Sequence, residues 1–344
     1  MSALEPVKVL VVDDSAHNRR LLTELLESSP DVKVVGTACD GNEGLRQVLA
    51  LHPDVVTLDL EMPRLGGYSF LRLLKSSAPT PVIVISSYAH KTDVFKALEL
   101  GAFDFIAKPA KPTPDVLEKL RKELHEKVQA ARLVRTAEVK PAARKPKVMP
   151  LEPSFVVGIG ASTGGPPAVQ RLLESLAPEP SMSLLVCQHM PKQFTRAFAE
   201  RLDKLGPFTV REAQEGDLLA PGHVFIAPGG RQLVVYRQNG QYVLGTPPPT
   251  MQDKHAPSVD RLFMSLAEVF GSKTIGVVLT GMGSDGAVGA KVIRKAGGEV
   301  WAESEETAVI YGMPQEAVAT GAVSRVLPLG EIGPALVDLA RKRR

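Results

Sequence analysis

The stretch Phe155-Val-Val-Gly-Ile-Gly-Ala-Ser-Thr-Gly-Gly165 decides the fold class of the second half of this 344-residue chain. An apolar, strand-like run leads into a glycine-flanked serine, and residues 166–176 then have helical spacing. Strand, tight turn and helix together form the repeating unit of a parallel α/β sheet. The turn would hold the Ser162 hydroxyl at the edge of the sheet, where glycines let backbone N–H groups approach a reacting oxygen. Ser162, in a pattern with nucleophile-elbow spacing, is therefore a candidate nucleophile.

Length and composition favour two globular domains in a reducing compartment. The chain is 44% hydrophobic, and no apolar run approaches the ~20 residues that a membrane-spanning helix needs. The first residues lack a secretory signal pattern. Two cysteines, Cys39 and Cys187, exclude a disulfide framework. We expect a cytoplasmic protein without membrane insertion, and the net charge of +3 is too small to indicate nucleic-acid binding.

The first part of the chain alternates apolar runs with amphipathic segments, which predicts a doubly wound parallel sheet with helices on both faces. The expected strands are residues 7–12, 32–35, 55–58, 82–85 and 103–107. The expected helices are residues 16–28, 42–51, 68–76, 92–100 and 113–133. After them, residues 139–150 are rich in proline and lysine and indicate a linker. We expect domains at residues 1–127 and 153–344, joined by residues 128–152.

The second part resumes the alternation and predicts another α/β domain, mostly parallel. The expected strands are residues 155–159, 184–187, 224–227, 275–279 and 323–327. The expected helices are residues 166–176, 193–205, 258–270, 287–296 and 332–342. Residues 233–236 and 242–244 flank Gln238-Asn-Gly240, a strong signal for an antiparallel hairpin.

Three carboxylates follow two strands of the first predicted sheet. Asp13 and Asp14 end the first strand and Asp59 ends the third, and these strands are neighbours in a 2-1-3-4-5 order. Carboxylates in one crevice repel each other unless a hard cation neutralises them, which predicts a Mg²⁺ site. Ser86 and Lys108 end the fourth and fifth strands, where a hydroxyl and an ammonium would hold an incoming phosphoryl group.

A serine nucleophile needs a base, and three histidines follow the predicted linker. His189 directly follows a strand and would share the edge with Ser162, so we rank it first. His255 precedes a helix in a loop and ranks second. His223 lies in a turn before a strand, at the opposite edge, and ranks third.

The histidine needs an acid, and Asp285 is the candidate, in the glycine-rich turn after residues 275–279. Helix capping is the alternative role for Asp285. The neighbouring Met282 N–H would help to form an oxyanion hole. The chain order Ser, His, Asp differs from that of ordinary α/β-hydrolases. Cys187 is a rival nucleophile, but its apolar neighbours favour an inert thiol.

The first domain resembles response-regulator receiver domains, which have a flavodoxin-like fold. The residues that carry the resemblance are Asp13-Asp14, Asp59, Met62-Pro63, Gly66-Gly67, Ser86, Gly101-Ala102 and Lys108-Pro109. The resemblance implies Asp59 as phosphoacceptor, Mg²⁺ ligation by Asp13, Asp14 and Asp59, and phosphate sensing by Ser86 and Lys108. The resemblance also places Phe105 at the position of the family's switch aromatic residue. It implies a chemotaxis-type histidine kinase as phosphodonor.

Residues 153–340 resemble the chemotaxis protein-glutamate methylesterase domain, a Rossmann-like α/β domain. The motifs are residues 158–165, 188–191, 227–230, 255–260 and 279–286. The resemblance implies Ser162, His189 and Asp285 as a catalytic triad, with Thr163 and Met282 near the oxyanion. It implies methyl-accepting chemoreceptor helices as substrate, glutamine deamidation as a second reaction, and no cofactor for the esterase.

Together these features predict a monomeric serine hydrolase that is switched on by phosphorylation. Two rival functions remain open at this point. A DNA-binding response regulator would carry a helix-turn-helix after the linker. A non-enzymatic adaptor would keep the fold and act by docking alone.

Overall fold

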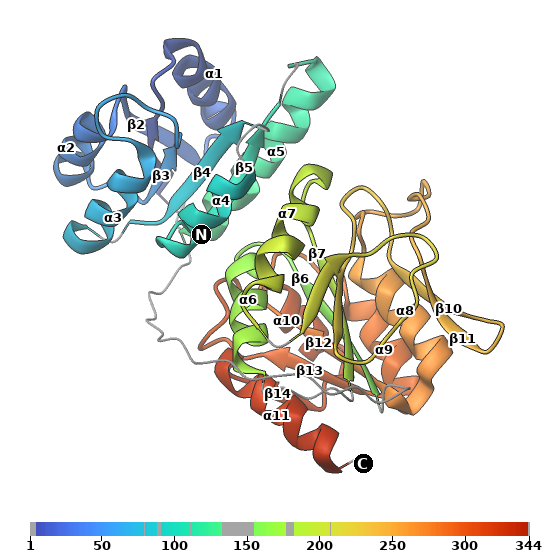
Figure 1. The fold of residues 1–344 in the computed structure, drawn as a ribbon. Coiled ribbons are helices and arrows are strands. Elements are labelled where there is room, and N and C mark those ends of the chain that lie inside the picture. The colour runs from blue at the N-terminus through green and yellow to red at the C-terminus, as the bar shows by residue number, and fades with distance from the viewer. Residues whose placement is uncertain are drawn as a thin grey trace. The chain divides into compact units, whose positions relative to one another are not determined.

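The computed structural model describes residues 5–78, 80–87, 91–109, 112–132, 155–176, 182–206 and 208–342. These residues form two compact units that divide between Val134 and Arg135. Each unit is an α/β domain built on a parallel sheet (Figure 1). The second unit is thus not the helix-turn-helix of a DNA-binding regulator. Within the described residues, no helix is both long and apolar enough to cross a membrane.

The sheet of the first unit has the strand order β2-β1-β3-β4-β5, as the sequence predicts, and all its strands are parallel. Its strands are β1 Val7–Val12, β2 Val32–Ala38, β3 Val55–Leu58, β4 Val82–Ser87 and β5 Asp104–Lys108. Its helices are α1 Ala16–Glu27, α2 Gly41–Leu51, α3 Gly67–Ser77, α4 Lys91–Glu99 and α5 Pro114–Ala131. Because the crossover from β1 to β2 runs in one direction along the sheet and the crossover from β2 to β3 runs in the other, right-handed connections put α1 and α2 on opposite faces.

The last helix of this unit extends into the stretch expected to be a linker. Helix α5 ends at Ala131, close to the end expected for the helix at residues 113–133 but past residue 128, where we expected the linker to begin. The rest of that stretch, from residue 133 to residue 152, lies outside the described residues.

The second unit contains a seven-stranded parallel sheet in the order β14-β13-β12-β6-β7-β9-β8. Its strands are β6 Phe155–Ala161, β7 Met182–Gln188, β8 Thr209–Glu212, β9 His223–Ile226, β12 Thr274–Val278, β13 Glu299–Glu303 and β14 Arg325–Leu327. Its helices are α6 Gly165–Ser175, α7 Lys192–Asp203, α8 Val259–Phe270, the short η1 Gly271–Lys273, α9 Ala287–Lys295, α10 Met313–Ala319 and α11 Leu329–Lys342. Helix α6 packs against α7 and α11, and α8 packs against α9, giving a helical layer on each face of the sheet.

The central strand β6 is buried along its whole length because helix α8 lies directly on it. A Cβ atom on Gly158 would lie 2.7 Å from Leu266, and one on Gly160 would lie 2.8 Å from a methyl group of Val259. Glycine therefore stands where strand and helix approach too closely for a larger residue. This close packing fixes the position of β6 against α8, and therefore the position of the residues that follow β6.

The predicted hairpin is present as β10 Val234–Gln238 and β11 Gln241–Gly245, an antiparallel pair apart from the main sheet. Asn239 and Gly240 both have positive φ, as a tight hairpin turn requires. Four elements were not predicted: β8, β13, α10 and the short 3-10 helix η1. Strand β8 is a short strand at the sheet edge, and β13 has a glutamate at each end around only three apolar residues. Neither pattern stands out from a loop in sequence.

Candidate active site and acidic cluster

Three of the predicted site residues lie at the carboxyl edge of the second sheet, each after a different strand. Ser162 follows β6, His189 follows β7, and Asp285 lies in the turn between β12 and α9. These strands are adjacent in the order β12-β6-β7. Strand β6 connects to β7 on one side, while β12 connects to β13 on the other, so the site lies where the winding direction reverses. Open α/β sheets bind ligands at such a point.

The turn that carries Ser162 is held by hydrogen bonds to both neighbouring strands. The Ser162 N–H donates to the Thr280 carbonyl over 3.0 Å, and Gln188 Nε2 donates to the Ser162 carbonyl over 2.8 Å. Gly164 adopts a φ of 73°, which favours glycine in the tight turn before α6. A Cβ on Gly281 would lie 2.8 Å from the Ser162 Cβ, so the two turns touch. The backbone thus fixes the serine while its side chain stays partly exposed.

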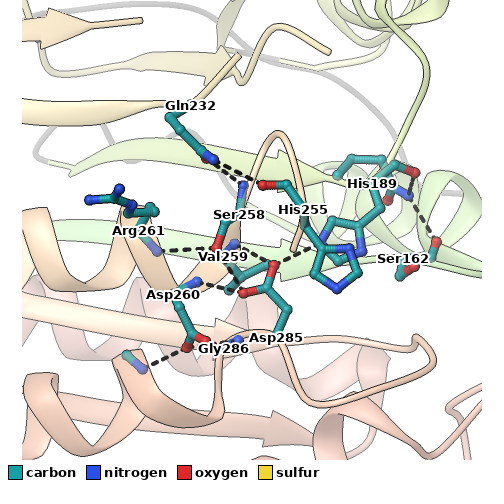
Figure 2. A network of polar contacts seen from close by, with 12 residues as sticks. Ser162, His189, Gln232, His255, Ser258, Val259, Asp260, Arg261, Asp285 and Gly286 are labelled. Carbon is teal, nitrogen blue, oxygen red and sulfur yellow. Dashed lines mark hydrogen bonds and ion pairs between the residues drawn. The ribbon is translucent and has the colours of Figure 1, made fainter. Parts of the chain in front are cut away.

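His189 is oriented by Asp285. His189 Nε2 lies 2.8 Å from Asp285 Oδ2, and an ionised carboxylate only accepts, so Nε2 carries the proton. Nδ1 is then the ring nitrogen left to act as a base. In the view of Figure 2, Ser162 lies on the other side of the His189 ring from Asp285. The His189 N–H also donates to the Ala161 carbonyl over 3.0 Å, which ties β7 to the serine turn.

Asp285 accepts hydrogen bonds from four groups. Besides His189, these are Ser258 Oγ at 2.9 Å, the Val259 N–H at 2.7 Å and the Asp260 N–H at 2.9 Å. Burial alone would raise the pKa of the carboxyl, but the bond from His189 and those from the backbone N–H groups outweigh it and lower the pKa to about 2. Asp285 therefore stays ionised, and its three donors besides His189 come from the start of α8 rather than from its own helix (Figure 2).

The turns that carry Thr163 and Met282 are cross-linked beneath the serine. Thr280 Oγ1 donates to the Thr163 carbonyl over 3.0 Å, and the Gly281 N–H donates to the Ile310 carbonyl over 3.1 Å. The Met313 N–H donates to the Gly281 carbonyl over 2.7 Å. Their backbones therefore lie beside Ser162, where N–H groups would be available to a developing negative charge.

One polar residue of the site was missed by the sequence analysis. Glu303 ends β13 and is fully buried; it accepts from the Thr280 N–H over 2.9 Å and from Thr307 Oγ1 over 3.0 Å. Burial raises the pKa of its carboxyl to about 7. Glu303 thus supports the Thr280 turn from below. The only signal in the sequence was a glutamate at the end of a three-residue apolar run.

The two lower-ranked histidines occupy different places. His255 stacks on His189, with ring centroids 4.4 Å apart and ring planes 11° apart (Figure 2). His223 begins β9 and therefore lies at the amino edge of the sheet, away from Ser162. Cys187 is buried in β7, and burial raises the pKa of its thiol well above the usual range, which favours an inert thiol.

In the first unit, Asp13 and Asp14 follow β1 and Asp59 follows β3, so the predicted cluster forms at the carboxyl edge. One oxygen from each of the three carboxylates lies within 4.8 Å of the others. Lys108 Nζ bonds Asp13 Oδ2 at 2.8 Å and Asp59 Oδ2 at 2.5 Å. Ser86 is buried near the end of the neighbouring strand β4.

The charge balance of this cluster suits a divalent cation. Burial raises the pKa of Asp59 above its usual value, even though Lys108 forms an ion pair with it. The pKa of Lys108 is raised as well, because its bonds to Asp13 and Asp59 outweigh burial. Lys108 thus pairs with two of the three clustered carboxylates, and the three oxygen donors are of the kind that Mg²⁺ prefers. Phe105, the residue at the switch position, is buried on β5. Its ring packs edge to face against that of Phe95, with the ring centroids 6.2 Å apart.

The carboxylate cluster of the first unit and the Ser162 site of the second unit define a class of protein. In this class a receiver-type α/β domain precedes a hydrolase-type α/β domain. Residues 9–121 match the family described as the response regulator receiver domain, and residues 157–336 match the CheB methylesterase family. The chain belongs to the CheB methylesterase family, with a receiver domain ahead of the methylesterase domain.

Relatives with both domains cover nearly all of the chain. A Myxococcus xanthus protein named protein-glutamate methylesterase/protein-glutamine glutaminase 1 is 66% identical over the whole of both chains. A Geobacter sulfurreducens protein named protein-glutamate methylesterase/protein-glutamine glutaminase 3 is 45% identical, and the match covers 97% of this chain and 98% of that protein. The crystal structure of the Thermotoga maritima CheB methylesterase catalytic domain is 39% identical, with a TM-score of 0.53, and covers 54% of this chain and 98% of that one.

Proposed function

We propose that this chain is a phosphorylation-gated serine hydrolase that demethylates γ-glutamyl methyl esters on the cytoplasmic helices of chemoreceptors. The observation that supports it most directly is the His189–Asp285 pair at the strand edge beside Ser162. The names of the full-length relatives support the choice of substrate.

In the proposed reaction, His189 Nδ1 takes the proton of the Ser162 hydroxyl as Oγ attacks the ester carbonyl. Asp285 holds the ring and stabilises the imidazolium through Nε2. Backbone N–H groups at Thr163 and Met282 bind the oxyanion of the tetrahedral intermediate. The intermediate expels methanol, which receives its proton from His189. Water, deprotonated by His189, then attacks the acyl group; the bond to Ser162 Oγ breaks, His189 returns the proton to Oγ, and the glutamate side chain is released.

The same residues serve deamidation of receptor glutamines. The γ-carbonyl of glutamine is attacked as that of the ester is, and the tetrahedral intermediate then expels ammonia instead of methanol. His189 again supplies the proton to the leaving group, so no further residue and no cofactor is required in the second domain.

The acidic cluster is proposed to control when this site works. A chemotaxis-type histidine kinase would donate a phosphoryl group to Asp59. Mg²⁺, bound by Asp13, Asp14 and Asp59, would neutralise the charge on the transferring group. Lys108 already contacts Asp59, and the Lys108 ammonium and the Ser86 hydroxyl would hold the phosphoryl oxygens. The phosphorylated receiver would then shift the protein toward a state in which substrate reaches Ser162.

Methanol release from methylated receptor membranes tests the activity, with a phosphodonor and Mg²⁺ present. We expect Ser162→Ala to abolish release, and Asp59→Asn to leave only the rate seen without phosphodonor. Cys187→Ala is the control, because its buried thiol has no role in the scheme. Undiminished release by Ser162→Ala would refute the catalytic assignment, and an unchanged response to phosphodonor in Asp59→Asn would refute the gating.

We also propose the domain boundaries, the oligomeric state and the location of the chain. Residues 1–127 form the receiver, residues 128–152 the linker and residues 153–344 the catalytic domain of a monomer in the cytoplasm. Sedimentation of the full chain, with and without phosphodonor, measures the oligomeric state, and a dimer in either condition would contradict it.

A further inference from the structure

We propose that His255 is a positioning residue for the base, its ring forming a platform that holds the His189 ring toward both Asp285 and Ser162. This inference rests on the proposed function, because it assigns a role within that reaction. In the reaction His255 would touch neither the substrate nor a transferred proton.

The stacking geometry is the first observation. The ring planes of His189 and His255 are 11° apart and their centroids 4.4 Å apart, which is face-to-face contact. The bond from Nε2 to Asp285 holds one edge of the His189 ring but leaves the ring free to swing about that bond. The His255 ring against the face of the His189 ring prevents this rotation. Nδ1 of His189 then keeps one direction, in the plane of its ring, toward the position that the Ser162 hydroxyl must take.

The loop that carries His255 is itself fixed by a buried amide. Gln232 is 2% exposed, and its Nε2 donates to the His255 carbonyl over 2.9 Å. Its Oε1 accepts from the Ser258 N–H over 2.8 Å. The Gly230 N–H donates to the Ala256 carbonyl over 2.9 Å, just between these two contacts. His255 is exposed, and an exposed loop would not otherwise keep a ring in a single position, so these bonds give the platform its rigidity (Figure 2).

The same segment also holds the acid. Ser258 Oγ and the N–H groups of Val259 and Asp260 all donate to the Asp285 carboxylate. One stretch, residues 255–260, therefore contacts His189 through a ring and Asp285 through three donors. It sets the two members of the pair relative to each other, although they follow strands β7 and β12, which lie on either side of β6.

The platform is also suited to the charge that forms during the reaction. When His189 takes the serine proton, it becomes a cation against the face of the His255 ring. An aromatic face attracts a nearby cation, so an uncharged ring at this position favours the charged intermediate over the resting state. A phenylalanine ring retains both the shape and this electrostatic property, whereas alanine retains neither.

His255→Ala and His255→Phe, made in the full chain, separate these roles. Two rates are measured: methanol release, and labelling of Ser162 by a fluorophosphonate. In the labelling, Oγ bonds to phosphorus, fluoride leaves, and His189 takes the serine proton. We expect His255→Ala to lower kcat and the labelling rate at least tenfold with KM within twofold, as loss of alignment does. His255→Phe should restore both rates to within about threefold of wild type. Lys254→Ala, an exposed neighbour in the same loop, is the control and should behave as wild type.

Wild-type rates in His255→Ala would overturn the proposal. Equal impairment of the Phe and Ala variants would also overturn it, because His255 would then act through its nitrogens. If the Ala variant does not fold, His255→Leu replaces it, since leucine keeps bulk without an aromatic face. A wild-type protein that is labelled but releases no methanol would refute the proposed substrate, while the labelling rates still decide the role of His255.

Discussion

Replacement of Glu303 by glutamine should make the second domain more stable above neutral pH. Glu303 is fully buried, and its two oxygens accept from Thr280 N–H and Thr307 Oγ1. Burial raises the pKa of its carboxyl from 4.5 to about 7. Arg171 on α6 is the cation that interacts with it, and burial lowers the pKa of Arg171 itself. The folded protein therefore holds a proton on Glu303 that the unfolded chain releases at a lower pH.

The size and sign of the effect follow from proton linkage. Between pH 4.5 and about 7 the folded state binds one more proton than the unfolded state, so the free energy of unfolding falls as pH rises. A pKa that is about 2.5 units higher in the folded state corresponds to a loss of about 3 kcal/mol, complete above pH 7. Glutamine has a similar shape and no proton to lose. The stability difference between Glu303→Gln and wild type should therefore grow by about 3 kcal/mol from pH 4.5 to pH 8.

The single tryptophan gives a selective assay. Trp301 is fully buried on β13, the strand that Glu303 ends, so its fluorescence reports on the second domain alone. Urea unfolding at several pH values yields the free energy of each variant. Glu305→Gln is the matched control, because Glu305 is exposed two residues away. Stability curves of wild type and Glu303→Gln that run parallel across this pH range would refute the reasoning.

Three further predictions concern other residues of the two sites. The Asp285 pKa, lowered from 3.8 to about 2, contributes about 2 kcal/mol of stability that is present above pH 4 and lost as pH falls through 2. The difference between wild type and Asp285→Asn in Trp301-monitored unfolding should shrink accordingly, and a constant difference would contradict this. Gly281→Ala would place a methyl group 2.8 Å from the Ser162 Cβ, so fluorophosphonate labelling should slow by about tenfold or more; an unchanged rate would count against the close contact. Asp13→Asn removes one of three clustered carboxylates and should weaken Mg²⁺ binding in calorimetry at least tenfold, whereas the exposed Asp31→Asn should not; equal affinities would exclude this metal site.

The parallel sheets and the edges that carry the candidate residues follow from local patterns. Apolar runs such as residues 9–12 and Phe155–Ala161 are buried on both faces, and such runs indicate strands without tertiary information. Asn239-Gly240 sets its turn by its own backbone preference. By contrast, β13 was missed because an ionisable residue, Glu303, is buried at its end, and the contacts that satisfy this carboxyl come from Thr280 and Thr307, which lie outside the strand.

The sequence by itself determined which residues lie at the carboxyl edges, because a residue that directly follows a buried parallel strand has no other place to be. Ser162, His189 and Asp59 were located in this way. Only the tertiary structure decided how they are held. The donors to Asp285 come from the start of α8, and the ring against His189 comes from the loop before it. Such contacts join segments far apart in the chain, and their partners are chosen by packing rather than by any local pattern.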